Sequence, residues 1–291
     1  MRALEDTIAA LGHPVFVRAL GAPSEPTAAI ARWRHGPSIV DVAPSNTIRL
    51  AMSLVDARNA RNRSGGKSAG QPQGGSVSIF SPMEGASIEV GGEADVVQVF
   101  LDQTYAEETV DTPFACPPMF DLRDDWMRTV IMRVLVGSAR RGPDDELMVE
   151  EDLRALARRI ERHATKWRDR IETPSPLFRG GLAPAAFRRV EAIIEAALDK
   201  ASSPTLAEMA NAVGLSVTHF VRAFGQHTGS TPHKYLVRRR MERAVSLLRV
   251  ARISVGEVAD EVGFSTPAHF VASFRAAMGV TPGAVRDALA S

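Results

Sequence analysis

The stretch that decides the fold is TLAEMANAVGLSVTHFVRAFGQHTGSTP, residues 205–232. It occurs again, with changes, as SVGEVADEVGFSTPAHFVASFRAAMGVTP at residues 254–282. The matched positions lie 49 apart at first and 50 apart after one inserted residue: Thr205 with Ser254, Gly214 with Gly263, and Phe224 with Phe274. Ordered matches over blocks of this length predict a duplicated structural unit.

Each copy predicts two short helices joined by a tight turn. In the first copy Thr205 and Glu208 have the spacing of a capping box, which satisfies free amides at a helix start. Gly214 then ends that helix, because glycine readily takes the left-handed conformation. Ser216 caps the next helix. The second copy repeats these signals with Ser254, Glu257, Gly263 and Thr266. Two helices joined in this way form a helix-turn-helix.

A longer helix is predicted between the copies, beginning after Thr231 and ending near Val250. At about 1.5 Å per residue it is roughly 27 Å long. A spacer of that length suits two recognition helices in successive major grooves of DNA, about 34 Å apart. Its apolar face is expected to be buried and its arginines to lie on or near the exposed surface: Arg238, Arg239, Arg240 and Arg243.

The block resembles the DNA-binding domain of the AraC/XylS family of bacterial transcription regulators. The resemblance covers about residues 187–289 and rests on GLSVTHFVRAFGQHTGSTPHKYLVRRRMERAVSLL and ISVGEVADEVGFSTPAHFVASFRAAMGVTP, followed by Arg286. It implies two helix-turn-helix motifs, at 205–228 and 254–278, each offering one helix to the major groove. It also implies an N-terminal domain that is often cupin-like and binds an effector or dimerises.

Within the two recognition helices, the predicted base contacts are Thr218, Val221, Arg222 and His269. Arg222 is the strongest of them because a guanidinium fork can grip guanine; a phosphate contact or a surface ion pair is the alternative. The second helix carries the short Ala268 and Ala272, so we expect it to read bases weakly. The predicted phosphate contacts, each with a generic polar surface as the alternative, are Ser216, His219, Lys234, Arg238, Arg240, Thr266 and Arg275.

Upstream, residues 28–102 predict a small antiparallel sheet or cupin-like barrel from five β-type runs: SIVDV, TIRLAMSLV, SVSIFS, ASIEV and DVVQVFL. His13 and His35 lie far apart and outside the strand cores, so neither a metal site nor a catalytic site is predicted. We expect the barrel to act as a binding pocket or as a scaffold. The polar segment 58–75 predicts a flexible loop.

Two amphipathic helices are predicted after the sheet. The second has an apolar stripe made of Leu153, Leu156, Ile160, Ala164, Trp167 and Ile171. This stripe either packs within the domain or pairs with its copy in a homodimer. The Pro- and Gly-rich segment 172–184 then predicts a linker. The expected architecture is α+β, with an N-terminal effector-binding or dimerisation domain at 1–172, a linker at 173–186 and a DNA-binding domain at 187–289.

Composition is consistent with this organisation. The chain has 291 residues, 45% of them hydrophobic, which favours two domains. A single cysteine, Cys116, excludes an intramolecular disulfide. No apolar run reaches the ~18 residues of a membrane span, so we expect a cytoplasmic protein. Residues 205–291 hold 10 Lys/Arg and 6 Asp/Glu, a net of +4, while residues 1–204 have a net of −3. The asymmetry favours an anionic partner for the C-terminal part.

The sequence therefore predicts a transcriptional regulator and not an enzyme. It is expected to bind double-stranded DNA, to need no cofactor, and to work as a homodimer. A small-molecule effector is possible, and RNA polymerase is a partner if the protein activates transcription. Two alternatives stay open. One is an effector-independent DNA-binding or interaction protein. The other is a cupin-type enzyme with a DNA-targeting tail, which the missing metal cluster and nucleophile motifs disfavour.

Overall fold

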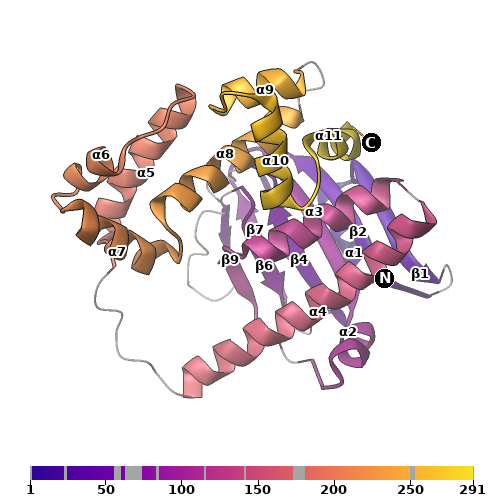
Figure 1. The fold of residues 1–291 in the computed structure, drawn as a ribbon. Helices are drawn as coiled ribbons and strands as arrows, with labels where there is room; N and C mark the ends of the chain where they lie inside the picture. The colour runs from indigo at the N-terminus through magenta and orange to yellow at the C-terminus, as the bar shows by residue number, and fades with distance from the viewer. Residues whose placement is uncertain are drawn as a thin grey trace. The chain divides into compact units, whose positions relative to one another are not determined.

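The computed structural model describes residues 2–22, 25–55, 60–62, 74–82, 85–114, 116–140, 142–172, 181–249 and 253–290 (Figure 1). The chain divides into two compact units. We call residues 1–173 together with 278–291 the N-terminal unit, and residues 174–277 the helical unit. Among the described helices, none has the length and apolar character that crossing a membrane requires.

Antiparallel strands build the N-terminal unit as two sheets. The larger has the order β1-β2-β8-β4-β6-β9. Its strands are β1 (Phe16–Ala22), β2 (Glu25–His35), β4 (Thr47–Ser53), β6 (Val77–Phe80), β8 (Ala94–Asp102) and β9 (Met119–Leu122). The smaller sheet has the order β3-β7-β5. It consists of β3 (Ser38–Val42), β7 (Ala86–Val90) and β5 (Ala60–Asn62).

The predicted antiparallel sheet is confirmed, and all five predicted runs form strands. Strand β8 lies inside the larger sheet and is buried on both faces, which explains its nearly continuous apolar sequence. Strand β1 and the first part of β2 were not predicted. They are joined across an irregularity at Gly21, whose φ of 95° suits glycine. Most of the predicted loop lies outside the described residues, but Ala60–Asn62 pairs with β7.

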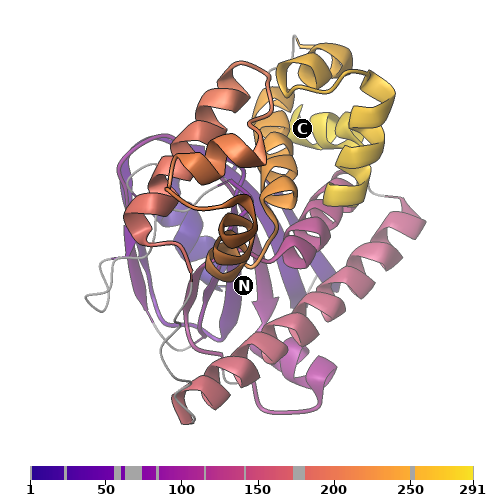
Figure 2. The same ribbon diagram turned by 60° about the vertical axis from the view of Figure 1, so that its left-hand side comes forward.

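The helices described before residue 173 are α1 (Arg2–Leu11), α2 (Gln103–Val110), α3 (Asp125–Arg140) and α4 (Pro143–Glu172). Helices α3 and α4 are the predicted pair, and they lie side by side in Figures 1 and 2. The stripe from Leu153 to Ala164 is fully buried within the chain, as the intradomain interpretation requires. The side chains of Trp167 and Ile171 lie outside the described set.

Helices α1 and α2 were missed. Helix α1 carries a readable signal, because Ala3, Leu4, Ile8 and Leu11 share one face and Gly12 follows with a φ of 79°. That face packs on Ala29, Ala31, Trp33 and Phe100 of the larger sheet.

The last helix, α11 (Pro282–Ala290), belongs to the N-terminal unit and packs against α3. Arg32 Nη1 donates to the carbonyl oxygen of Leu289 at 2.6 Å. The same guanidinium grips Asp95 with two bonds, of 2.9 and 2.8 Å, and both side chains are almost completely buried. Gly279 approaches α3 so closely that an added Cβ would lie 2.6 Å from Thr129 Cγ2. This contact and its φ of 73° both require glycine there.

The helical unit contains α5 (Pro184–Asp199), α6 (Leu206–Asn211), α7 (Val217–Thr228), α8 (Pro232–Leu248), α9 (Val255–Glu261) and α10 (Pro267–Met278), whose last residue falls in the N-terminal unit. Phe220 and Phe224 are fully buried on one face of α7, with ring centroids 5.5 Å apart. Phe270 and Phe274 repeat this on α10 at 5.6 Å. The sequence duplication is therefore also a duplication of packing.

Candidate nucleic-acid interface

The cap of α6 is the predicted capping box. Thr205 Oγ1 accepts from the amide of Glu208 at 3.1 Å, and the Thr205 amide donates to the Glu208 carboxylate at 2.7 Å. The backbone and hydroxyl bonds from Thr205 lower the pKa of Glu208. The turn passes through Gly214, with a φ of 69°, and Ser216 then caps α7 by accepting from the His219 amide. These predicted caps are confirmed.

The second copy is built in the same way. Ser254 Oγ accepts from the Glu257 amide at 3.1 Å, and the Ser254 amide donates back to the carboxylate at 2.7 Å. The side-chain and backbone bonds from Ser254 lower the pKa of Glu257. Thr266 Oγ1 accepts from the His269 amide at 3.3 Å, as predicted, and α10 begins at Pro267. The first turn of each recognition helix is thus fixed by a side-chain cap, Ser216 for α7 and Thr266 for α10.

Helix α7 presents a polar face opposite its two buried phenylalanines. Thr218, Arg222 and Gln226 are exposed and follow one another at intervals of four residues, so they lie on one side of the helix. Arg222 makes no hydrogen bond or ion pair with any described residue. Gln226 was not predicted as a site residue, although its spacing from Arg222 is a usable signal. The geometry brings three groups able to bond base edges onto one surface.

Two other predicted positions on α7 differ in exposure. His219 is exposed, whereas Val221 is half-buried and packs against the core of the helical unit. His227 is exposed overall. Its ring nevertheless stacks on Phe187, with centroids 4.3 Å apart, and its Nδ1 donates to the carbonyl oxygen of Leu182.

Helix α10 offers a smaller set of polar groups. Ala268, His269, Ala272 and Arg275 are all exposed. The ring of His269 contacts Phe264 edge-on, with centroids 5.2 Å apart. Arg275 has no hydrogen bond or ion pair with the described residues. On α10 two alanines, Ala268 and Ala272, stand where α7 has Thr218 and Arg222, and Arg275 is a cation without a partner among the described residues. The two recognition helices are therefore chemically unequal.

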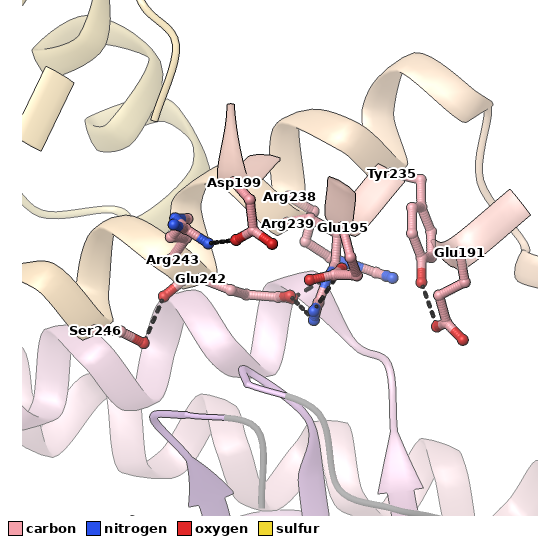
Figure 3. A network of polar contacts seen from close by, with 9 residues as sticks. All are labelled: Glu191, Glu195, Asp199, Tyr235, Arg238, Arg239, Glu242, Arg243 and Ser246. Carbon is pink, nitrogen blue, oxygen red and sulfur yellow. Dashed lines mark hydrogen bonds and ion pairs between the residues drawn. The ribbon is translucent and has the colours of Figure 1, made fainter. Parts of the chain in front are cut away.

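The expected exposure of the α8 arginines is wrong for two of them, Arg238 and Arg239, which are 9% and 6% exposed (Figure 3). Arg238 lies over the Tyr235 ring, 4.6 Å from its centroid, and its Nε is 3.4 Å from a Glu242 oxygen. Arg239 pairs with Glu242 at 2.9 Å and with Glu195 at 2.8 Å. These guanidinium groups hold the helical unit together.

The partners of α8 come mainly from α5, as a ladder of three contacts (Figure 3). Tyr235 donates to Glu191, Arg239 to Glu195, and Arg243 to Asp199. Each pair is separated by 44 residues, so the two helices run in the same direction along this stripe. Three positions spaced by four on each helix match one another. The pattern is visible in the sequence only once the two helices are known to be neighbours.

The remaining predicted phosphate contacts divide into two groups. Lys234 is exposed at the start of α8, with its side chain unpaired among the described residues. Arg240 is half-buried, donates to the Ser202 carbonyl and the Ser203 hydroxyl, and has a pKa lowered by burial. The described residues include no cluster of three or more His, Cys, Asp or Glu side chains that could hold a metal ion.

Comparison with known proteins matches residues 209–288 to a family described as Helix-turn-helix domain. The uncharacterized HTH-type transcriptional regulator YidL of Escherichia coli is 38% identical over 81 residues, which are 28% of this chain and 27% of YidL. The HTH-type transcriptional regulator GlxA of Rhizobium meliloti is 33% identical over 102 residues, 35% of this chain and 30% of GlxA. The matched part therefore spans less than a third of either curated relative.

Among solved structures, a transcriptional regulator with an AraC-type DNA-binding domain from Chromobacterium violaceum is 27% identical. The alignment covers 37% of this chain and 94% of that one, with a TM-score of 0.35.

Proposed function

We propose that this chain, whose residues 209–288 form a helix-turn-helix domain of the AraC/XylS type, is a sequence-specific DNA-binding transcriptional regulator. The observation that carries the proposal is the duplicated helix-turn-helix, whose first recognition helix has an exposed Arg222 with no partner among the described residues. Such an arginine has its full set of donors available for a base edge or a phosphate. Proteins of this type are regulators and not enzymes, and we assign this chain no catalytic residue.

The two helix-turn-helix motifs contribute differently in this proposal. Helix α7 reads bases through Thr218, Val221 and Arg222, while α10 contributes His269 and mostly holds the backbone. The proposed phosphate contacts are Ser216, His219, Lys234, Thr266 and Arg275. Arg238 and Arg240 are weaker candidates than they were from sequence, because each is already engaged within the helical unit.

We further propose that residues 1–172 form a regulatory domain, linked by 173–186 to a DNA-binding domain at 187–289. Its two sheets would form a cupin-like barrel that binds a small-molecule effector or supports a homodimer. Contact with RNA polymerase follows if the protein activates transcription. Because its target is bacterial genomic DNA, the protein would act in the cytoplasm.

The proposal is tested by footprinting the purified full chain on genomic fragments. We expect protected segments on one face of the duplex, with two major-groove contacts about one helical turn apart. The logarithm of the binding constant should fall linearly with the logarithm of salt concentration, because basic groups displace counterions. Binding to random-sequence DNA at the same salt concentration is the control for specificity.

Two outcomes would contradict the proposal. Absence of binding to every genomic fragment at low salt would remove the DNA-binding role. Equal affinity for genomic and random DNA would remove the sequence specificity and favour an architectural or interaction protein.

A further inference from the structure

Helix α4 divides into two halves of opposite charge. Residues 143–153 hold six Asp/Glu and no Lys/Arg, whereas residues 154–170 hold seven Lys/Arg and two Asp/Glu, so a net of −6 is followed by a net of +5. Residues 1–204 as a whole have a net of −3. The basic half of α4 is therefore not a general property of this part of the chain.

The acidic half of α4 is accounted for within the chain. Its carboxylates form ion pairs with arginines: Glu146 with Arg18, Glu150 with Arg154, and Asp152 with Arg133. Asp144 and Asp145 lie in the first turn, where the helix dipole favours negative charge. This half needs no partner from outside the protein.

The basic half carries cations of the opposite kind. Arg158, Arg162 and Lys166 are exposed, and none of the three forms a hydrogen bond or ion pair with a described residue. They follow one another at intervals of four residues, so they lie on one side of the helix. We call these three residues the basic stripe.

The next face of α4 shows how the fold treats the other basic groups of this half. Arg159 Nε donates to Asp124 Oδ2 at 2.7 Å, and His163 Nε2 lies 2.6 Å from the same oxygen. The guanidinium of Arg159 also lies over the Trp126 ring, 5.6 Å from its centroid. The described residues thus supply an anion to this inner face and none to the basic stripe.

The spacing of the basic stripe is unfavourable for an isolated helix, because like charges four residues apart repel each other. The helix dipole does not compensate for it. The dipole favours cations only in the last turn, and α4 ends at Glu172, six residues beyond Lys166. An anion bound from outside the protein would relieve the repulsion.

The dimensions of the basic stripe suit a polyanion with regularly spaced charges. At about 1.5 Å per residue, the distance along the helix from Arg158 to Lys166 is about 12 Å. Duplex DNA of that length carries about three or four phosphates on each strand. Three cations on long side chains are thus enough to face the phosphates of one strand.

The basic stripe also lies near the end of α4 that leads to the helical unit. Helix α4 ends at Glu172 and α5 begins at Pro184, so 11 residues join them. A fully extended chain of this length spans at most roughly 40 Å. A tether this short keeps the stripe near any DNA that the helical unit binds, which raises its effective concentration at the phosphates.

We propose that the basic stripe of α4 is a further DNA-contacting surface, which binds the phosphate backbone beside the segment read by α7 and α10. The stripe adds affinity but no sequence information, because phosphates are alike at every base pair. The N-terminal unit then helps to hold the operator directly. This proposal rests on the proposed function, since the helical unit has to bring the DNA.

A second copy of this chain is the competing partner. The acidic half of its α4 would have to supply the anions, yet Glu150 and Asp152 already pair with Arg154 and Arg133. DNA phosphates bound by the helical unit have no such competing partner in α4. The observations therefore favour DNA.

The test variant combines Arg158→Gln with Arg162→Gln in the full chain. Binding is measured by fluorescence anisotropy at several salt concentrations on a footprinted duplex with about one extra helical turn on each side. Loss of two phosphate contacts should make the slope of log K against log salt concentration shallower by about 1.8. A fourfold rise in salt should then weaken the test variant about 12-fold less than the unmodified protein. Random-sequence DNA should show the same change in slope.

Two control variants isolate the charge and its position. Arg158→Lys with Arg162→Lys keeps both charges and should keep the slope. Arg34→Gln with Arg140→Gln removes two exposed cations elsewhere in the N-terminal unit and should also keep it. Because all four positions are exposed, each variant should melt within about 2 °C of the unmodified protein. A test variant that melts at a clearly lower temperature would show that the stripe is structural.

The length of the DNA gives an independent measurement. On a duplex trimmed to the two major-groove contacts, the unmodified protein and the test variant should bind alike. On the longer duplex only the unmodified protein should gain affinity.

Three outcomes would overturn the proposal. An unchanged slope for the test variant, in a protein that binds its site specifically, would reject the basic stripe and keep the regulator. Absence of specific binding by the unmodified chain would reject the regulator and the stripe with it. Sedimentation without DNA at low salt is the third measurement. A dimer that the test variant breaks would assign the stripe to a second copy of the chain.

Discussion

Arg222→Ala is the substitution that tests the recognition surface most directly. Arg222 is exposed and has no partner among the described residues, so its removal leaves no buried group unsatisfied. The free energy of unfolding should therefore change by no more than about 0.5 kcal/mol. A lost bidentate contact to a base costs about 1–3 kcal/mol of binding. This corresponds to a roughly 5- to 150-fold rise in Kd.

The assay is fluorescence anisotropy on a footprinted site and on its single-base-pair variants. The unmodified protein should discriminate at one position where Arg222→Ala does not. Arg222→Lys is the matched control: it keeps the charge but loses the planar fork, so it should behave like alanine at that base pair.

A phosphate contact gives a different pattern. Arg222→Ala would then weaken binding equally on all sequences and make the salt dependence shallower by about one unit, while Arg222→Lys would bind almost normally. Either that pattern or a large drop in melting temperature would refute the base-reading role.

Three further predictions concern stability. Arg239→Met should lower the free energy of unfolding by about 3 kcal/mol in urea titrations, because the buried Glu242 loses its ion pair with Arg239; an unchanged midpoint would show that the ladder is dispensable. Thr205→Ala should lower the free energy of unfolding by about 1 kcal/mol in the same titration, since the capping box is lost. An unchanged free energy would mean that water caps the start of α6 equally well. Burial, opposed by Arg133, raises the pKa of Asp152 from 3.8 to about 6, so the folded state holds this proton more tightly than the unfolded state. The proton on Asp152 therefore stabilises the folded state fully below pH ~4, and this stabilisation is lost as the pH rises to about 6. Asp152→Asn should flatten the plot of melting temperature against pH between these two values. An unaltered slope would mean that another group titrates there.

Much of the helical unit can be predicted from sequence because its signals are local. A capping box spans four residues, a turn glycine acts on its own φ angle, and Phe220 and Phe224 are one helical turn apart. The caps at Thr205, Ser216 and Thr266 were accordingly found at the right residues.

The strands of the N-terminal unit are harder to predict from the sequence. Strand β1 carries Gly21 next to its last residue, which weakens the alternating pattern, and among the described strands it pairs with β2 alone. The predicted strand region begins at residue 28 and therefore leaves out α1 and β1, which pack against it. Partners distant in sequence determine such strands, and a single sequence does not identify those partners.

The sequence alone determined the duplicated helix-turn-helix, its caps and the inequality of its two recognition helices, because these depend on residues within a few positions of one another. The tertiary structure decided which charges are free. Arg222 and Arg239 are equally cationic in the sequence, yet one faces solvent and the other is held by Glu195, 44 residues away. Arg32 and Arg49 differ in the same way, since among the described residues only Arg32 pairs with an aspartate. A charge is available to a ligand only when the fold has not already paired it, and pairing depends on distances that only the folded chain sets.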